Sequence, residues 1–486
     1  MKLFSLLEPL HILYKPDDLE DIPISNIQFH SKKVTNQSVF VAISGHEHDG
    51  HDYINDVIKA GAVAIIGEKP LRNLNVPYIQ VQNSRLALTQ LAKQLYKNER
   101  NPVLIGVTGT NGKTTTTYML RHILEEAGIR CSLIGTVSHI INGVSFASEN
   151  TTPDTLTIQR LISESHDDVI IIEVSSHGLE QGRVEGLEFD YALFTNLSHD
   201  HLNYHGSIYR YFEAKSKLFD FLAPTGEAII STSSVWGTRL IDKLINKEKN
   251  VYSVGYNEMD NMNVLNVNVE FSTDFELHDG ADSFKVNVPL TGVHNAWNAS
   301  LSFVTAKRMG VNSQKIIQSL RSFPGVPGRF EMYPQTNGVT MVIDYAHTPD
   351  ALTHCFQTLH SVGAKKITHI FGFRGNSDPS KRAEMLEISS KWSGEYILTF
   401  DDLNGVKQKE MISLLEMYQK QYGNRKGRII PDRTLAIQSA LENAKGDDYI
   451  LITGKGPENY KESFCLPTTS DKETILFINK QPRLIQ

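Results

Sequence analysis

Short apolar runs alternate with amphipathic segments along the chain, which is the pattern of an α/β protein. Three apolar runs of the first hundred residues predict strands: 39–44, 62–67 and 78–81. The segment 84–99 predicts a helix, because Leu88, Leu91 and Leu95 recur on one face. An Asn-Pro pair then punctuates the chain, so we expect a small α/β domain over residues 1–100.

The next segment, 101–328, has the order strand, glycine-rich turn, helix. The apolar run 103–108 is followed by a helical pattern that begins near Lys113 and ends at Gly128. Further strands are expected at 167–174 and 190–197, with a helix at 208–222. Buried apolar strands separated by helices are typical of a parallel sheet.

Beyond Arg329 the strand and helix alternation starts afresh, which predicts a second doubly wound sheet over residues 329–486. A helical pattern at 432–444 separates two of its strands. Five apolar runs predict those strands: 340–346, 366–373, 395–400, 427–430 and 448–454.

Composition is that of a folded, soluble protein. The 486 residues suggest about three domains. Hydrophobic residues are 40% and charged residues 21%, which disfavours both disorder and a membrane protein. Fifty-five acidic against 48 basic side chains give a net charge of −7, so we expect no nucleic-acid partner, and local sites must hold any acidic ligand.

The cysteines and the apolar runs indicate the compartment. Cys131, Cys355 and Cys465 lie far apart, which disfavours a disulfide framework or a cysteine zinc site and fits a reducing environment. Glu8 and Lys15 interrupt the N-terminal apolar segment, and no apolar run reaches the length of about 18 residues that a membrane span needs. We therefore expect a cytoplasmic protein without membrane insertion.

The turn between the strand at 103–108 and the following helix is a variant phosphate loop. It reads Gly-Thr-Asn-Gly-Lys-Thr-Thr from Gly109 to Thr115, where backbone N–H groups and the helix dipole can surround phosphate oxygens. The strict consensus wants glycine at position 107, where this chain has Val107. In such loops the lysine, here Lys113, contacts the β- and γ-phosphates, and Thr114 would bind Mg²⁺.

A phosphate loop needs an acid for its metal, and Glu173 ends an apolar strand where a carboxylate would emerge beside the loop. A surface glutamate on an edge strand is the simpler alternative. The stretch His199 to Gly206 carries three histidines and an aspartate, which suggests a metal or phosphate site. Zinc is one possibility, but Glu173 and the phosphate loop favour Mg²⁺.

Nine ordered motifs make the chain resemble the Mur ligase family over almost its whole length. Within that family the resemblance is to the UDP-N-acetylmuramoyl-tripeptide synthetases, the MurE type. The motifs are TGTNGKTTT, NTTPDTL, EVSSHGLEQGRVEG, FTNLSHDHLNYHGS, EAKSKLF, GVHNAWNAS, GVPGRFE, DYAHTPDAL and GKGPENY.

This resemblance implies a three-domain α/β architecture: an N-terminal UDP-sugar domain, a central ATP-binding phosphate-loop domain and a C-terminal Rossmann-like amino-acid domain. It also implies an ADP-forming amide ligase of peptidoglycan precursor synthesis, hence of cell-wall formation, cell shape and division. A carboxylate attacks the γ-phosphate of ATP, and an amino acid's amine then displaces phosphate from the acyl phosphate. Domain closure would exclude water from that intermediate.

By resemblance, the catalytic and metal residues are Lys113, Glu173, His201 and Lys215. One Mg²⁺ would lie on Thr114 and Glu173, and a second on His201 and a carbamylated Lys215. A carbamate supplies the oxygen anion that Mg²⁺ prefers, whereas a protonated amine cannot. The resemblance assigns ATP to Gly109, Thr110, Asn111, Gly112, Lys113, Thr114, Thr115, Asn295, Asn298, Arg329, Asp344 and His347.

The acceptor, a UDP-linked muramoyl dipeptide, is assigned by resemblance to Thr151, Thr152, Ser175, Gln181 and Arg183. Hydroxyls and a guanidinium suit a carboxylated peptide. The uridine motif departs from the family, because His30-Ser31-Lys32 replaces Asp-Ser-Arg. Ser31 is the residue kept there. The loop after the first domain's strand appears as Gly45-His46-Glu47-His48.

The amino-acid pocket departs further from the family. Members that use diaminopimelate carry Asp-Asn-Pro-Arg, whose arginine clamps the distal carboxylate, but here the sequence is Asp401-Asp402-Leu403-Asn404. A lost guanidinium and the added Asp402 favour a distal ammonium, so lysine or another basic amino acid is expected. Arg382, Gly454 and Glu458 match the positions that hold the α-carboxylate and α-amine.

Three alternatives stay open. A paralogue of the same fold would join an amino acid to a different carboxylate in a specialised pathway, and the altered motifs motivate it. Folylpolyglutamate synthetase is a more distant relative. A non-catalytic binding protein would have no need of both metal positions, which Lys113, Glu173, His201 and Lys215 preserve. We expect a monomer.

Overall fold

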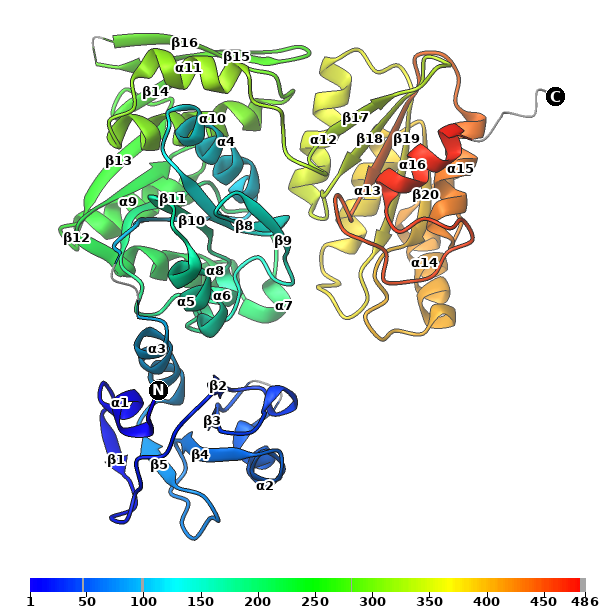
Figure 1. The fold of residues 1–486 in the computed structure, drawn as a ribbon. Helices are drawn as coiled ribbons and strands as arrows, with labels where there is room; N and C mark the ends of the chain where they lie inside the picture. Colours follow the sequence, from blue (N-terminus) through cyan, green and yellow to red (C-terminus); the bar gives the residue numbers. More distant parts are fainter. Residues whose placement is uncertain (46–47, 98–99, 281, 481–486) are drawn as a thin grey trace.

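The computed structural model describes residues 1–45, 48–97, 100–280 and 282–480, and three sheets follow one another along the chain (Figure 1). The N-terminal domain lies at one end of the molecule, next to the central domain. The C-terminal domain lies beside the central domain. The α/β class expected from the sequence is confirmed.

The N-terminal sheet has the strand order β1-β5-β4-β3-β2, with β1 antiparallel to β5 and the other pairs parallel. Leu88 and Leu91 are buried in its core, as the helical pattern predicts. The helix ends at Leu95 rather than at 99. The elements are α1 (Leu3–Leu7), β1 (Ile12–Tyr14), β2 (Asn26–Gln28), η1 (Ser31–Lys33), β3 (Ser38–Val41), η2 (Gly50–Tyr53), α2 (Ile54–Lys59), β4 (Ala62–Gly67), β5 (Tyr78–Val81) and α3 (Ser84–Leu95).

The central sheet has the order β16-β15-β14-β13-β12-β11-β6-β10-β7-β8-β9. Its middle strands, from β14 to β7, are parallel, as predicted. The strands are β6 (Val103–Thr108), β7 (Cys131–Ile134), β8 (Ser138–Ile141), β9 (Val144–Ala147), β10 (Val169–Glu173), β11 (Phe189–Phe194), β12 (Leu222–Ser231), β13 (Asn250–Gly255), β14 (Met262–Val269), β15 (Thr273–Asp279) and β16 (Asp282–Val288).

Helices cover both faces of this sheet. Residues of α4, α10 and α11 fill one apolar core, and residues of α5, α8 and α9 fill the core on the other face. The expected helix 208–222 is shorter, because α8 passes into a 3-10 turn before β12 begins at Leu222. The helical elements are α4 (Lys113–Glu126), α5 (Thr155–Glu164), α6 (Ser176–Glu180), α7 (Leu202–His205), α8 (Ile208–Ser216), η3 (Lys217–Phe221), α9 (Val235–Ile245), α10 (Val293–Arg308) and α11 (Ser313–Arg321).

Both edges of the central sheet are antiparallel, which the sequence pattern did not reveal. The hairpins β8–β9 and β15–β16 extend it on either side. Strand β9 is exposed throughout, so it has no apolar run to signal it.

The C-terminal sheet, in the order β17-β18-β22-β19-β20-β21, is parallel except at β17. Helices α12, α13 and α14 pack on one face and α15 and α16 on the other, so it is doubly wound as predicted. The elements are β17 (Glu331–Pro334), β18 (Thr340–Asp344), α12 (Pro349–Ser361), β19 (Ile367–Phe373), α13 (Arg382–Trp392), β20 (Glu395–Phe400), α14 (Gln408–Tyr422), β21 (Gly427–Ile429), α15 (Arg433–Asn443), β22 (Tyr449–Thr453) and α16 (Asp471–Lys480).

The predicted domain boundaries, after residues 100 and 328, fall between the sheets and stay a prediction. Among the described residues, no helix has both the length and the apolar character that a membrane crossing needs.

Candidate active site

The phosphate loop connects the end of β6 to the start of α4, and its glycines are required by space. Gly109 has φ 147°, and a Cβ there would lie 1.9 Å from Thr195 Oγ1. Gly112 has φ 83°, and its Cβ would lie 2.3 Å from Asn298 Oδ1. Val107 belongs to the buried strand β6, so the turn begins two residues after the consensus position. This explains the variant motif.

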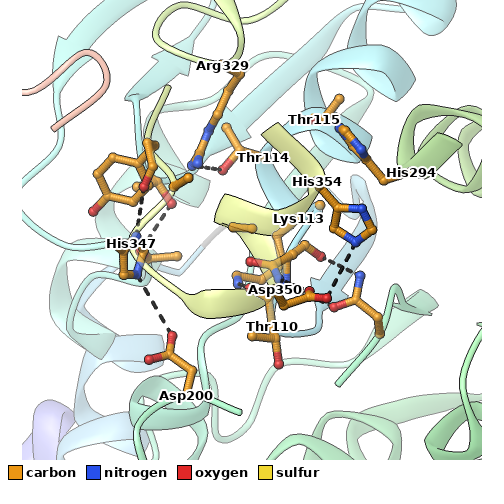
Figure 2. A pocket seen from close by; sticks show the side chains of 18 of the residues that line it. Thr110, Lys113, Thr114, Thr115, Asp200, His294, Arg329, His347, Asp350 and His354 are labelled. Carbon is orange, nitrogen blue, oxygen red and sulfur yellow. Dashed lines mark hydrogen bonds and ion pairs between the residues drawn. The ribbon is translucent and has the colours of Figure 1, made fainter. Parts of the chain in front are cut away.

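Lys113 is the first residue of α4, and its side chain folds back on the loop (Figure 2). Its Nζ donates to the carbonyls of Gly109 and Thr110, each at 2.8 Å. Burial lowers the pKa of this ammonium. A buried lysine at a helix N-terminus, beside unpaired N–H groups, is suited to an anionic phosphate chain.

Glu173 ends β10 and is completely buried, so it is not the edge-strand surface residue considered as the alternative. Its Oε2 accepts hydrogen bonds from Thr114 Oγ1 at 2.9 Å and from Thr136 Oγ1 at 2.8 Å. Its Oε1 accepts from the Thr136 N–H at 3.0 Å. The convergence of carboxylate and hydroxyl oxygens beside the phosphate loop fits the oxygen ligands that Mg²⁺ takes.

Lys215, on α8, also contacts the phosphate loop. It is 1% exposed, its Nζ donates to the Gly109 carbonyl at 2.7 Å, and the amine lies 4.5 Å from the centre of the Tyr211 ring. Burial and the nearby Lys113 hold the pKa of Lys215 well below its usual value. Such an amine is held towards its neutral, nucleophilic form.

His201 adopts φ 53° immediately before α7. Its Nε2 lies 3.3 Å from Asp200 Oδ2, and burial lowers the pKa of His201 to about 4. The charge of Lys215 acts on the same imidazole. Within the described part of the chain, no three His, Cys, Asp or Glu side chains gather as a metal cluster. The fit for Mg²⁺ therefore rests on the hydroxyl and carboxylate oxygens of Thr114, Thr136 and Glu173.

A cavity of about 320 Å³ lies where the central and C-terminal domains meet. Asp200 bridges this boundary, because its carboxylate lies 3.0 Å from Lys381 Nζ and 3.8 Å from His347 Nε2. The Asn111 side chain donates to Asp350 at 2.8 Å (Figure 2). Predicted residues that line the cavity are Thr110, Asn111, Gly112, Lys113, Thr114, Thr115, Thr151, Ser175, His201, Lys215, Asn298, Arg329, Asp344 and His347.

The predicted ATP residues contribute to this cavity in different ways. Arg329 donates to Thr114 Oγ1 at 3.2 Å. Asn295 is buried on α10 and accepts from Asn298 at 3.4 Å, so it positions Asn298 instead of lining the cavity. The Asp344 carboxylate accepts from the N–H groups of Phe330 and Ala346, and burial raises its pKa. Its visible role is to hold the turn after β18.

The residues predicted to bind the peptide form one hydrogen-bonded chain. Thr152 Oγ1 donates to the Glu173 carbonyl at 2.8 Å and accepts from the Ser175 N–H. Arg183 donates to the Thr152 carbonyl at 2.6 Å and to Gln181 Oε1 at 2.7 Å. Thr151 accepts from Thr136 Oγ1, a residue the sequence reading missed.

The N-terminal motif approaches this chain of residues. Burial lowers the pKa of His30, and the charges of Asp154 and Arg183 also act on it. Ser31 follows in η1, which brings the predicted uridine motif towards the peptide residues without lining the main cavity. His46 and Glu47 of the predicted loop lie outside the described residues.

Around the predicted amino-acid residues, every carboxylate has a cation. Asp402 is bonded to Lys455 and lies 3.0 Å from Lys461 Nζ. Glu458 Oε2 lies 2.5 Å from Arg374 Nη2. The expectation that Asp402 offers a free negative charge therefore loses its basis, since both of its oxygens are already paired.

The remaining predicted residues of this pocket have structural partners. Arg382 donates to the Arg374 carbonyl at 2.9 Å, and Asn404, at φ 46°, donates to the Gly375 carbonyl at 3.0 Å. A second cavity, of about 20 Å³, is lined by Arg382 and Asp401 together with Arg374. Sequence reading missed Arg374, Lys381 and Lys455, although Arg374 directly follows β19 and Lys455 lies two residues after β22, at strand ends where α/β proteins place their sites.

Three successive segments of the chain match known domain families. The Mur ligase family catalytic domain matches residues 23–96, the Mur ligase middle domain 107–306, and the Mur ligase glutamate ligase domain 328–456. The chain is 35% identical over 466 residues to "UDP-N-acetylmuramoyl-L-alanyl-D-glutamate--2,6-diaminopimelate ligase" of Alkaliphilus metalliredigens, covering 94% of this chain and 93% of that protein. The chain belongs to the Mur ligase family.

Two further proteins of the same name are similar to this chain. A protein of the same name from Alkaliphilus oremlandii is 36% identical over 474 residues, with 96% of each chain covered. A solved structure of a ligase of that name aligns with a TM-score of 0.68 at 25% identity, over 99% of both chains. The predicted three-domain Mur ligase fold is confirmed, and the chain is an ATP-dependent ligase.

Proposed function

We propose that this ligase joins a basic amino acid, lysine or a relative with a second amino group, to UDP-N-acetylmuramoyl-L-Ala-D-Glu in peptidoglycan precursor synthesis. The observation that carries the proposal is the meeting of three groups at one loop: the phosphate loop itself, the Thr114–Glu173 pair and the buried Lys215. The names of the relatives support the acceptor, which is the same, while they name diaminopimelate as the added amino acid. The basic amino acid is proposed because Asn404 stands where the family has the arginine that clamps a distal carboxylate.

Each group of residues in the cavity has its own role. The loop N–H groups and Lys113 bind the phosphates, so that the γ-phosphorus faces the acceptor carboxylate. That carboxylate would lie near Thr151, Ser175 and Arg183, which carry hydroxyls and a guanidinium. The carboxylate oxygen bonds to the γ-phosphorus as ADP leaves. The amine then attacks the acyl carbon, loses a proton and releases phosphate.

Thr114 and Glu173 would hold one Mg²⁺, and His201 with carbamylated Lys215 a second. Bound there, Mg²⁺ neutralises charge on the phosphates. Carbamylation joins the neutral Lys215 amine to CO₂ and releases one proton. The lowered pKa of that amine, caused by burial, supports this step.

We also propose that the chain acts as a monomer in the cytoplasm, with domains 1–100, 101–328 and 329–486. The three free thiols suit a reducing compartment. We propose that the predicted site residues named above bind ATP, the acceptor and the amino acid as assigned.

A second candidate is the specialised paralogue that uses another acceptor carboxylate. The altered His30-Ser31-Lys32 motif and the fully paired Asp402 favour it. An assay of ADP and phosphate release distinguishes the two candidate functions. Release that requires both the UDP-linked dipeptide and an amino acid supports the first, and release that requires another acceptor supports the second. Lys113→Ala should abolish that release while the protein stays folded, and retained turnover would contradict the phosphate-loop assignment.

A further inference from the structure

Arg374 lies in the amino-acid pocket at a position that no motif singled out. It follows β19 directly, and its side chain is 22% exposed and lines both the interdomain cavity and the smaller one. Its Nη2 lies 2.5 Å from Glu458 Oε2 and donates to the Gly454 carbonyl at 3.1 Å. Its Nε lies 3.5 Å from Asp401 Oδ1.

These acceptors are the set that would receive an ammonium group of a substrate. A carboxylate and a backbone carbonyl, held within reach of a second carboxylate, offer lone pairs and negative charge and no donor. The other oxygen of Glu458 accepts from Tyr345 Oη at 2.8 Å. Glu458 therefore has both oxygens occupied while Arg374 stays in place.

The charges of this cluster are already balanced. Three carboxylates, Asp401, Asp402 and Glu458, face three cations, Arg374, Lys455 and Lys461. An ammonium that entered this balanced cluster would add an uncompensated positive charge, which is costly away from water. One of the three cations must leave for the ammonium to bind.

Arg374 is the cation best placed to leave. Lys455 is almost completely buried beside Asp401 and Asp402, and Lys461 pairs with Asp402 from the surface. Arg374 is the cation that pairs with Glu458. Arg374 borders open cavity, and its buried Nε has no hydrogen-bond partner among the described residues. Moving Arg374 therefore costs the ion-pair contact of Nε with Asp401 but no hydrogen bond at this atom.

We propose that Arg374 is a specificity-determining residue that occupies the ammonium position of the free enzyme and is exchanged for the distal ammonium of the incoming amino acid. This rests on the proposed function, because it assumes a substrate with a second amino group. It also moves Gly454 and Glu458 from the α-carboxylate and α-amine, where the resemblance assigned them, to the distal amine, since the α-amine must lose a proton and attack the acyl carbon. The exchange makes binding depend on a cation that can compete for Glu458. It also predicts that removing the guanidinium strengthens binding of such substrates.

The test compares Arg374→Met with Arg374→Lys, which keeps the charge. Steady-state kinetics are measured for the basic amino acid that the wild-type enzyme uses best and for its analogue without the distal amine, norleucine in the case of lysine. For Arg374→Met we expect the KM of the basic amino acid to fall about tenfold, the gain from removing one competing partly buried ion pair. The KM of the neutral analogue should change less than twofold, and Arg374→Lys should restore the wild-type KM.

Each other outcome has a definite meaning. A KM that rises for the basic amino acid overturns the proposal, because Arg374 would then bind the substrate itself. An equal fall for both amino acids overturns it too, since relief of crowding alone would explain the change. Wild-type protein that binds ATP but uses no basic amino acid refutes the proposed function, and the exchange with it. Circular dichroism spectra that match the wild type check that both variants are folded.

Discussion

Asp200 and Lys381 form an almost fully buried ion pair of 3.0 Å that joins the central domain to the C-terminal domain. Asp200 precedes His201, which we propose as a magnesium ligand, while Lys381 precedes α13. His347 contacts the same carboxylate from the C-terminal side. The Asp200 carboxylate therefore contacts two residues of the C-terminal domain, and the Asn111–Asp350 hydrogen bond joins the same two domains.

Lys381→Gln removes the cation closest to Asp200. We expect kcat to fall at least about tenfold, because leaving a buried charge without its partner costs about 3–5 kcal/mol and opposes closure. Small-angle X-ray scattering with ATP analogue bound should show a larger radius of gyration than wild type. Lys365→Gln is the control, since Lys365 forms an exposed pair with Asp447. Equal kcat in the two variants would contradict the role of the pair.

Gly109→Ala places a methyl group 1.9 Å from Thr195 Oγ1, so we expect the loop to shift and ATP affinity to fall more than about tenfold. Gly363→Ala separates this clash from backbone strain, because Gly363 also has positive φ but no atom within 4 Å of the added Cβ. Titration with a fluorescent ATP analogue measures the ATP affinity of both variants. Wild-type affinity in Gly109→Ala would refute the loop geometry.

Acid should destabilise the C-terminal domain through His369. Its ring nitrogens contact Ser389 and Thr453, and burial lowers its pKa to about 3. Between the unfolded pKa near 6.5 and 3, the unfolded state binds a proton that the folded state does not. The free energy of unfolding should therefore fall by about 1.4 kcal/mol per pH unit from this group as the pH drops below 6.5.

Urea unfolding followed by circular dichroism at pH 7.5, 6 and 5 measures this slope. His369→Gln keeps hydrogen-bonding capacity without titrating. Its free energy of unfolding should therefore change less steeply with pH, by about 1.4 kcal/mol per pH unit, which is the contribution of one proton. Identical slopes for His369→Gln and wild type would show that His369 is not the group responsible.

Carbamylation of Lys215 predicts a carbamate carbon signal in the ¹³C spectrum of protein exposed to labelled bicarbonate. Lys215→Ala should lack the signal and most of the activity, and added formate or acetate should restore part of it. Lys217→Ala is the matched control, because Lys217 is a half-exposed neighbour paired with Glu180. Full activity of wild-type protein in CO₂-free buffer, with no carbamate signal, would contradict the role of Lys215.

The sequence predicts what depends on local pattern. The phosphate loop, its strand and its helix follow from glycine spacing and apolar periodicity, and Glu173 follows from its place at the end of a buried strand. Lys215 required the family resemblance, because a lysine on an amphipathic helix looks exposed until the fold buries it.

What the sequence could not reveal are pairings between distant segments. Asp402 carried a free negative charge in the sequence reading because Lys455 and Lys461 lie more than fifty positions away. Arg374 and Lys381 were overlooked for the same reason, since their partners Glu458 and Asp200 belong to other loops. The exposed strand β9 has no apolar period from which it could be predicted.

The central claim is best tested by the mass of the product formed with ATP, UDP-N-acetylmuramoyl-L-Ala-D-Glu and a panel of lysine, ornithine, diaminopimelate and neutral amino acids. We predict that one basic amino acid adds to the dipeptide, with one ADP formed for each product molecule. Protein that binds ATP but gives no product with any amine would contradict the account and indicate a different acceptor carboxylate.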